Sequence, residues 1–426
     1  MATRPRAAAL PTGAARKPVL LLALGSFALG TDAFVIGGVL PEVGASLRVG
    51  LGLAGLLITV FSAVYAVGAP VLTVLTGNFE RRKVLLTALA VFTAGNVLAA
   101  LADSYGVMVV ARVLSALGAA LYTPAATATA ASLAAPEERG RALATVLGGL
   151  TLATALGVPL GTLIANISQW RMTFVLVALL GAAALIGLGT SLTATPPSAV
   201  ASLRERLATA TVRTVPSTLV TTALTICGVF TLLTYLTWFV DRSSGITGAM
   251  VTVVYLVYGL GALISNTTAG MLIDHVSPRK VAAVSAIGLA AVFGALAVFA
   301  HAGDEGSHTG SRTVLLFVLI AAWALVGWMF IPAQQQRLLH STGPQASVAL
   351  SLNASAIYVG QALGGALGGA LLGQGTTALP LAAAACVLIS SAVLLATRAR
   401  RGGAAAAADG PSPVPAAGSV AEQGRS

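Results

Sequence analysis

Apolar residues follow one another along this chain in windows about as long as a bilayer is thick. Twelve windows come close to the ~20 residues that an α-helix needs to cross the hydrocarbon core. They cover residues 18–40, 52–75, 84–101, 107–133, 142–165, 172–192, 218–240, 248–273, 281–300, 313–338, 346–372 and 377–397. The pattern predicts an all-α integral membrane protein with twelve transmembrane helices.

More polar stretches divide these windows into two sets of six. Residues 193–217 form a connector between a first bundle at 18–192 and a second bundle at 218–397. A basic segment, 1–17, precedes the first bundle, and the tail at 398–426 has nothing to pack against, so we expect it to be disordered. The first window is longer than the roughly 7–15 apolar residues of a signal peptide. We therefore expect a retained first helix.

Composition agrees with a lipid-facing surface. Hydrophobic residues make up 57% of the 426 residues and charged residues 9%, with a mean hydropathy of +0.91. A soluble domain would carry about 25% charged residues. The two cysteines, Cys227 and Cys386, both fall inside apolar windows, which excludes a disulfide framework and a cysteine-rich metal site.

The net charge of +11 could suggest a nucleic-acid partner, but the basic residues lie between the apolar windows. Lysine and arginine are enriched in the cytoplasmic loops of membrane proteins. Eighteen of them fall in the segments on the side of the N-terminus, against four on the other side, Arg48, Arg171, Arg242 and Arg312. The chain is thus predicted to be multi-pass with both termini in the cytoplasm, and we expect no nucleic-acid partner.

An internal repeat supports the division into halves. The connection after the second window reads "TGNFERRKVLL" and the connection after the eighth reads "GMLIDHVSPRKVAAV". Their basic pairs, Arg82-Lys83 and Arg279-Lys280, are 197 residues apart and hold the same place in each half. Duplicated halves are typical of secondary transporters, whose substrate site lies near the bilayer midplane between them.

These features resemble the major facilitator superfamily, and within it the twelve-helix drug:proton antiporter branch that includes chloramphenicol and sugar efflux permeases. The resemblance covers about residues 18–397 and implies two pseudo-symmetric six-helix bundles. A family signature, G-x-x-x-D-R-x-G-R-R/K, follows the second helix. The second copy, at 270–280, keeps it better, with His275 where arginine is usual. In the first copy, Gly77 occupies the aspartate position and Glu80 follows three residues later.

The resemblance implies that these two loops act as a latch on one conformation. The latch residues would be Glu80, Arg81, Arg82, Lys83, Asp274, Arg279 and Lys280. The alternative is that the basic residues only anchor the loops in the cytoplasm.

The fifth window, "GGLTLATALGVPLGTLIANISQWRMTF", resembles the glycine-proline motif associated with antiporters. Gly149, Gly157, Pro159 and Gly161 lie on that motif. Gly149, Ala153, Gly157 and Gly161 are four residues apart, so they share a helix face that another helix can approach closely. Pro159 removes a backbone donor and favours a kink. The alternative, plain small-residue packing, is compatible with the motif.

Two charged residues stand well inside apolar windows. Asp32 lies about 12 Å, and Arg112 about 9 Å, from the predicted outer ends of their helices at a rise of 1.5 Å per residue. An ionisable residue inside a membrane is a functional hypothesis by default. The resemblance implies that both helices line a central cavity, so we expect Asp32 to carry the coupling proton with Arg112 as its partner. The alternatives are a static ion pair, or Asp32 capping a helix break beside Gly30.

Four further polar residues inside windows are candidate substrate contacts: Tyr65, Tyr235, Asn353 and Gln361. A pocket with aromatic rings and few charges suits a lipophilic substrate. Each residue could instead form an interhelical hydrogen bond or belong to an interfacial belt.

The predicted function is a secondary active transporter that exports a small lipophilic drug or antibiotic in exchange for protons. Export and antiport follow from the resemblance alone. Efflux of a sugar, nucleoside or other metabolite, and proton-coupled uptake, remain alternatives. The sequence contains neither H-E-x-x-H, nor G-x-S-x-G, nor a Walker P-loop, so we expect no enzyme. We expect no cofactor beyond the proton, a monomer, and the cytoplasmic membrane of a bacterium.

Overall fold

The computed structural model describes residues 15–193, 203–302 and 310–408. Within these ranges, twelve helices are long and apolar enough to cross a membrane, which confirms the prediction. The first six spans are α1 (Arg16–Gly38), α3 (Leu51–Leu75), α4 (Arg81–Leu101), α5 (Tyr105–Leu133), the composite span α6 (Arg139–Leu152)–η3 (Ala153–Gly157)–α7 (Val158–Ile167), and α8 (Trp170–Ser191). The last six are α10 (Val215–Leu233), α12 (Ala249–Ile273), α13 (Pro278–His301), the pair α14 (Gly310–Gly327) and α15 (Phe330–Thr342), α16 (Ala346–Leu371), and α17 (Ala378–Ala408).

Short helices connect or extend these spans. They are α2 (Leu40–Ser46), η2 (Pro136–Glu138), α9 (Leu203–Ala210), α11 (Leu236–Ser244), η4 (Gly343–Gln345) and η5 (Leu372–Gln374). The α9 helix lies in the predicted connector, of which residues 194–202 are outside the described ranges. Regular structure in the described chain is helical throughout.

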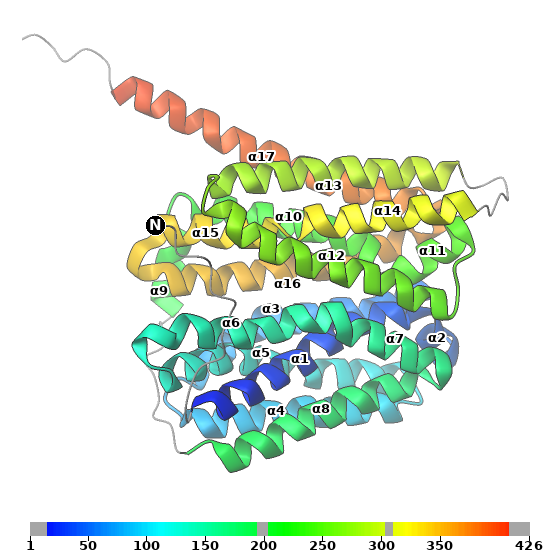
Figure 1. The fold of residues 1–426 in the computed structure, drawn as a ribbon, viewed down its shortest axis with the longest axis horizontal. Coiled ribbons are helices and arrows are strands. Elements are labelled where there is room, and N and C mark those ends of the chain that lie inside the picture. The colour runs from blue at the N-terminus through cyan, green and yellow to red at the C-terminus, as the bar shows by residue number, and fades with distance from the viewer. Residues whose placement is uncertain (1–14, 194–202, 303–309, 409–426) are drawn as a thin grey trace, which may run out of the picture.

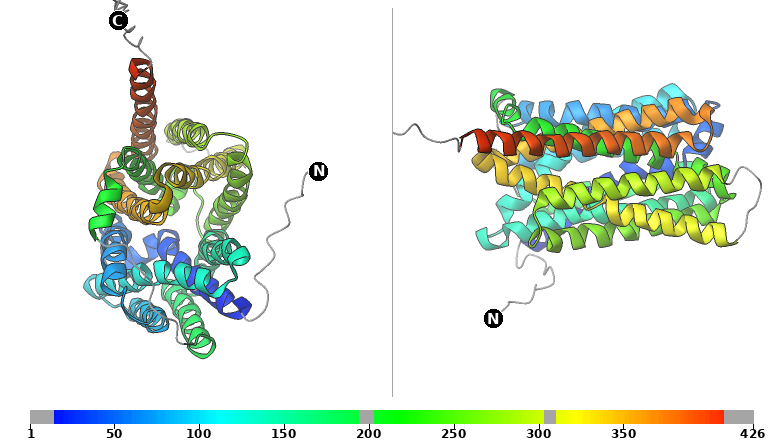
Figure 2. Two further views of the ribbon diagram at one scale, coloured as in Figure 1. Left: turned by 90° about the vertical axis from the view of Figure 1, so that its left-hand side faces the viewer. Right: turned by 90° about the horizontal axis from the view of Figure 1, so that it is seen from above.

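The spans form two sets of six, α1–α8 and α10–α17, that lie on opposite sides of the molecule (Figures 1 and 2). We call the end at which α1, α4, α6 and α13 begin the basic end, because Arg16, Arg81, Arg139 and Arg279 stand there. The other end, where α2 and α11 lie, is called the opposite end (Figure 1). Because successive spans are antiparallel, all basic loops gather at the same end.

The two halves meet along α3 and α16 and along α7 and α12. Near the opposite end, the Thr59 hydroxyl donates to the Ala362 carbonyl at 3.1 Å, and the Thr237 hydroxyl donates to the Gly37 carbonyl at 3.2 Å. The Asn166 amide donates to the Gly248 carbonyl at 3.2 Å. These hydrogen bonds join the halves at the opposite end.

Three spans depart from a continuous α-helix. The fifth contains a π-helical turn at Ala153–Gly157, just before Pro159. The seventh is interrupted at Thr234 and Tyr235, between α10 and α11. The tenth is interrupted at Trp328 and Met329, between α14 and α15. Two of these interruptions border the same cavity, which Thr154 and Thr234 line.

The last helix differs from the sequence prediction. Residues 398–408, which we expected to belong to a disordered tail, continue α17 as a helix whose last turns extend beyond the bundle (Figure 1). Arginine and alanine are strong helix formers, and an already formed helix propagates more easily than a new one nucleates. Residues 409–426 lie outside the described part of the chain.

Candidate functional site

An ion pair buried inside the first half joins α1 to α5. The Arg112 Nη1 donates to Asp32 Oδ1 at 2.7 Å, and the two side chains are 1% and 0% exposed. The contact that the sequence predicts from their similar depth is therefore present. Burial of two charges is tolerated only where they are paired with good geometry, since each alone would be strongly destabilising.

The pair retains unused hydrogen-bonding capacity. Asn96 and Ser115 lie beside the Asp32 carboxylate, and the Arg112 guanidinium stacks 4.5 Å from the centre of the Phe61 ring. Within the described residues, Asp32 Oδ2 and Arg112 Nε and Nη2 have no hydrogen-bond partner. Most buried polar atoms in folded proteins are satisfied, so each exception calls for an explanation, such as a water, an ion or a functional role.

The glycine face of the fifth span packs directly on the helix that carries Asp32. A Cβ atom on Gly149 would overlap the Ala23 carbonyl oxygen, and one on Gly157 would overlap the Thr31 hydroxyl. At Gly161 a Cβ would overlap Val35. The close helix approach expected from the four-residue spacing is present, and its partner is α1.

The π-helical turn also touches the second half. A Cβ atom on Gly259 of α12 would overlap the Thr154 carbonyl oxygen, so the two backbones are in direct contact. The turn at Ala153–Gly157 therefore lies between the helix of Asp32 and the opposite bundle. A movement of the second half against this turn can be transmitted to α1.

The four predicted substrate contacts do not form one cluster. Tyr235 donates to the Gly365 carbonyl at 2.9 Å near the opposite end, and Asn353 accepts a hydrogen bond of 2.9 Å from Thr222. Both are buried, Asn353 within the second half and Tyr235 where the second half meets Gly55 of α3. Gln361 is buried on α16 with no partner for its Nε2 among the described residues.

Tyr65 contacts an aromatic residue of the second half. Its ring stacks on Tyr358 of α16 with centroids 3.6 Å apart, and this contact bridges the two halves. Phe34 makes a second aromatic bridge, to Phe230 at 6.0 Å and to Trp328 at 6.5 Å. An aromatic residue two positions after Asp32 was a usable signal for a residue that faces the other half.

The two basic loops make matching contacts, each within its own half. Arg82 donates to the Gly189 carbonyl at 2.7 Å, and Arg279 donates to the Leu394 carbonyl. Gly189 lies near the end of α8, and Leu394 lies near the end of Ala378–Thr397, the membrane-spanning part of α17. The repeat seen in the sequence is therefore also a structural repeat.

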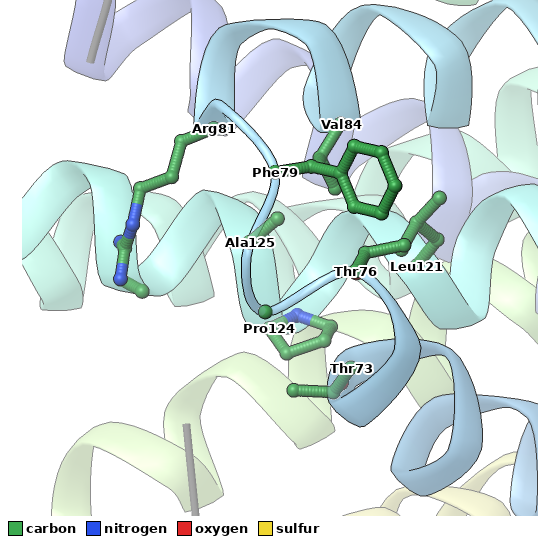
Figure 3. Close-up of a pocket in the computed structure, with 10 residues that line it drawn as sticks. Thr73, Thr76, Phe79, Arg81, Val84, Leu121, Pro124 and Ala125 are labelled. Carbon is green, nitrogen blue, oxygen red and sulfur yellow. The ribbon is translucent and has the colours of Figure 1, made fainter. Parts of the chain in front are cut away.

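The remaining latch residues are less engaged. Lys83 forms a 3.4 Å ion pair with Glu80, and Asp274 and Lys280 are exposed. Arg81 lines a cavity of about 420 Å³ beneath the first loop, together with Thr73, Phe79 and Pro124. Figure 3 shows Phe79 and Arg81 on opposite sides of the loop segment. Whether these loops latch one conformation stays a prediction.

The described residues were also compared with the side-chain clusters that bind metal ions. Within residues 15–193, 203–302 and 310–408, no three histidine, cysteine, aspartate or glutamate side chains gather as they would around a metal ion.

Comparisons with known proteins agree with the fold. The family model described as Major Facilitator Superfamily matches residues 22–244 and 218–421. The chain is 32% identical to the Bacillus subtilis protein "Uncharacterized MFS-type transporter YbcL" over 82% of this chain and 87% of that one. It is 31% identical to a Streptomyces lividans "Chloramphenicol resistance protein" over 86% and 92%.

A solved structure shares the fold at low sequence identity. It is a bacterial homologue of the human lysosomal transporter Spinster, in an inward-facing and unoccupied conformation. The TM-score is 0.69 at 15% identity, and the match covers 93% of this chain and 98% of that one.

Proposed function

The chain belongs to the major facilitator superfamily, and on that premise we propose that it exports a small lipophilic molecule in exchange for protons. Members of this family are membrane transporters and not enzymes. Beyond membership of the family, we propose the direction of transport, the coupling to protons and the class of substrate.

The Asp32–Arg112 pair is the observation that carries the proposal. A buried carboxylate exchanges a proton easily only if its counter-charge can come and go, because burial favours the neutral acid and a cation favours the anion. Here the counter-charge is one arginine on a different helix, held through Nη1 alone. A shift of α5 relative to α1 would remove it, and Asp32 would then take up a proton.

The fifth span supplies a route for coupling this exchange to transport. Its π-helical turn touches α1 through Gly157 and α12 of the second half near Gly259. Rocking of one half against the other is the usual way in which such transporters alternate access to a central site. In this protein, rocking would press on the turn and through it on the helix of Asp32.

The sidedness follows from the charges. We place the basic end in the cytoplasm, because lysine and arginine concentrate in cytoplasmic loops. The hydrogen bonds of Thr59, Asn166 and Thr237 then close the outer side. Export requires these bonds to break once a substrate has entered from the cytoplasm.

The substrate class is supported by the aromatic side chains that bridge the two halves. The bridging side chains between the halves are mainly aromatic, namely Phe34, Tyr65, Phe230, Trp328 and Tyr358. A relative with 31% identity is named for chloramphenicol resistance, which fits a compact aromatic substrate.

Proteoliposomes containing the purified chain test the proposal. They are loaded with labelled chloramphenicol, arabinose or uridine, and a pH gradient of either sign is imposed. For an antiporter, loss of a loaded compound speeds up when the outside is acidic. Faster loss only with an acidic lumen would indicate symport, and a response to arabinose or uridine alone would assign the metabolite alternative.

A further inference from the structure

Arg112 is held on two sides, and only one of them is the carboxylate. Its Nη1 donates to Asp32 Oδ1 at 2.7 Å, and its guanidinium carbon lies 4.5 Å from the centre of the Phe61 ring. A cation within about 6 Å of an aromatic face is attracted to that ring, and more strongly when both groups are out of water. Phe61 and Arg112 are each 1% exposed. Phe61 on α3 therefore helps to fix the position of the counter-charge.

The face of α3 that carries Phe61 also reaches the second half. Tyr65 follows Phe61 by four residues, so the two rings share a helix face, and their centres are 6.5 Å apart. Tyr65 in turn stacks on Tyr358 of α16, with ring centres 3.6 Å apart and planes 23° apart. Aromatic rings interact at centre separations of up to about 7 Å. The rings of Phe61, Tyr65 and Tyr358 thus form a continuous line of contacts that ends on Arg112, and we call it the aromatic path.

Tyr358 brings the second half close to the ion pair. The charge of Asp32 acts on Tyr358, so the two side chains lie near each other although they belong to different halves. The Tyr65 hydroxyl lies beside those of Tyr358 and Thr123, and Thr123 belongs to α5, the helix of Arg112. The helices α3, α5 and α16 therefore meet around the two tyrosines. A displacement of α16 relative to α3 changes the ring stack directly, because its two rings belong to different halves.

Arg112 has few other contacts that would keep it in place. Within the described residues, its Nε and Nη2 have no hydrogen-bond partner. An arginine has several rotatable bonds, so loss of the ring beside it makes other orientations accessible. Each such orientation weakens the bond to Asp32 Oδ1. Because a nearby cation favours the ionised carboxylate, a weaker bond makes protonation of Asp32 easier.

We propose that Tyr358 is a positioning residue for proton exchange at Asp32. Its ring acts through Tyr65 and Phe61, and the effect is to keep Arg112 on the carboxylate while the halves have this arrangement. The proposal rests on the export function above and deepens it, because it names a contact by which the second half acts on the counter-charge. The fifth span acts on the helix of Asp32, whereas the aromatic path acts on Arg112. When α16 moves away, the stack is lost, Arg112 is released and Asp32 takes up a proton.

The surroundings of Asp32 allow its titration to be followed separately. In the described part of the chain, the charged or titratable side chains that act on it or lie on the aromatic path are Arg112 of α5, Tyr65 of α3 and Tyr358 of α16. Asn96 of α4 and Ser115 of α5 are neutral neighbours, and the fifth and sixth spans approach α1 through glycines and neutral side chains. Tyr255 of α12 lies beside Gly37 and Gly38, more than one turn beyond Asp32. Tyrosine and arginine ordinarily titrate at about pH 10 or above, so a carboxyl titration below that range is distinct from theirs.

Infrared spectroscopy of the purified full-length protein in detergent tests the proposal without requiring transport. The carbonyl band of a protonated carboxylic acid reports protonation, and the part that disappears in Asp32→Asn belongs to Asp32. A pH series then gives the pH at which half of Asp32 is protonated. The variants are Tyr358→Leu, which removes the ring, and Tyr358→Phe, which keeps it. Phe293→Leu is the control, because that ring is also buried in the second half but meets Trp323, at 5.2 Å, instead of the aromatic path.

We expect Tyr358→Leu to raise the half-protonation pH of Asp32 by about 0.3 to 1 pH unit, in line with one lost aromatic contact. Phe61→Leu removes the ring that touches Arg112 and should raise it at least as far. Tyr358→Phe and Phe293→Leu should leave it unchanged. No shift in Tyr358→Leu would refute the aromatic path, and an equal shift in Tyr358→Phe would show that the hydroxyl acts instead of the ring. An equal shift in Phe293→Leu would assign the effect to loosened packing.

A second measurement separates this inference from the proposed function. If Asp32 shows no titrating band in the wild type, the proposed function loses its proton carrier, and thermal unfolding tests the aromatic path by itself. Tyr358→Leu should lower the melting temperature more in the wild type than in Arg112→Gln, where the path has no guanidinium to hold. Equal lowering in both backgrounds would refute the path whatever ion or substrate the protein transports.

Discussion

Removing one partner of the Asp32–Arg112 pair should destabilise the protein far more than removing both. In Arg112→Gln the carboxylate remains 0% exposed without its cation, and in Asp32→Asn the guanidinium remains without its anion. Breaking a buried pair in this way costs about 3–5 kcal/mol of unfolding free energy. The double variant leaves two neutral amides that can bond to each other, so we expect a coupling energy of at least about 2 kcal/mol.

The loss in Arg112→Gln should also depend on pH. An unpaired buried carboxylate is stabilised by taking up a proton, so the variant should be closer to wild type at low pH and less stable as the pH rises. The Asp32→Asn variant has no such group and should show no comparable trend. This difference separates a proton-accepting carboxyl group from one that only fills space.

The coupling energy is measured with a double-mutant cycle. Wild type, both single variants and the double variant are unfolded in mixed detergent micelles, and unfolding is followed by circular dichroism. Arg141→Gln is the control, because that arginine is exposed at the basic end. Single-variant losses that add up to the double-variant loss within about 0.5 kcal/mol would show that the two groups do not interact. A pH-independent loss in Arg112→Gln would refute proton uptake by Asp32.

Two further substitutions test the packing that surrounds the pair. Gly157→Val should destabilise the protein by about 1–3 kcal/mol, because a Cβ there overlaps Thr31. Gly148→Val should have little effect, because nothing lies within 4 Å of a Cβ at that position. Thermal unfolding in detergent compares the two variants. Arg82→Ala should lower the free energy of unfolding by about 1.5 kcal/mol, because the hydrogen bond to the Gly189 carbonyl is lost. Lys83→Ala should lower it by under about 1 kcal/mol, because the Lys83 side chain is 75% exposed. Equal losses would contradict the contact of Arg82 with the helix end.

The number and order of the spans could be predicted because they depend on length and apolarity alone. A sliding window detects these quantities whatever the helices later contact. The pairing of Asp32 with Arg112 was also accessible, because two isolated charges at similar depth in lipid have few other partners. The close face of Gly149, Gly157 and Gly161 followed from a four-residue spacing that needs no knowledge of the partner helix.

The interruptions of the helices were harder to predict. Apolarity does not report which carbonyl a backbone amide bonds, so the π-helical turn before Pro159 was foreseen only as a kink. The interruption at Trp328 does have a sequence signal: Pro332, four residues later, cannot donate to the Trp328 carbonyl. The interruption at Tyr235 has no local signal, because its hydroxyl bonds to Gly365, 130 residues away.

The cavity that Phe34, Thr154 and Thr234 line between the halves could not be predicted for the same reason. It is built where interruptions in two spans meet α1, α3 and α12. Tyr235 and Asn353 were expected near the substrate from their polarity, but each forms a hydrogen bond between packed helices, Tyr235 to the Gly365 carbonyl and Asn353 from Thr222. A polar residue in a span can contact the substrate or form a hydrogen bond between helices, and only its neighbours in the structure decide between the two.

Proton movement in everted membrane vesicles tests the central claim most directly. The vesicles are energised until their interior is acidic, and chloramphenicol is then added to vesicles with wild-type protein or with Asp32→Asn. The account predicts that the compound releases protons through the wild type and not through the variant, at equal amounts of protein in the membrane. Equal release by the variant would contradict it, because the coupling proton would then be carried by a group other than Asp32.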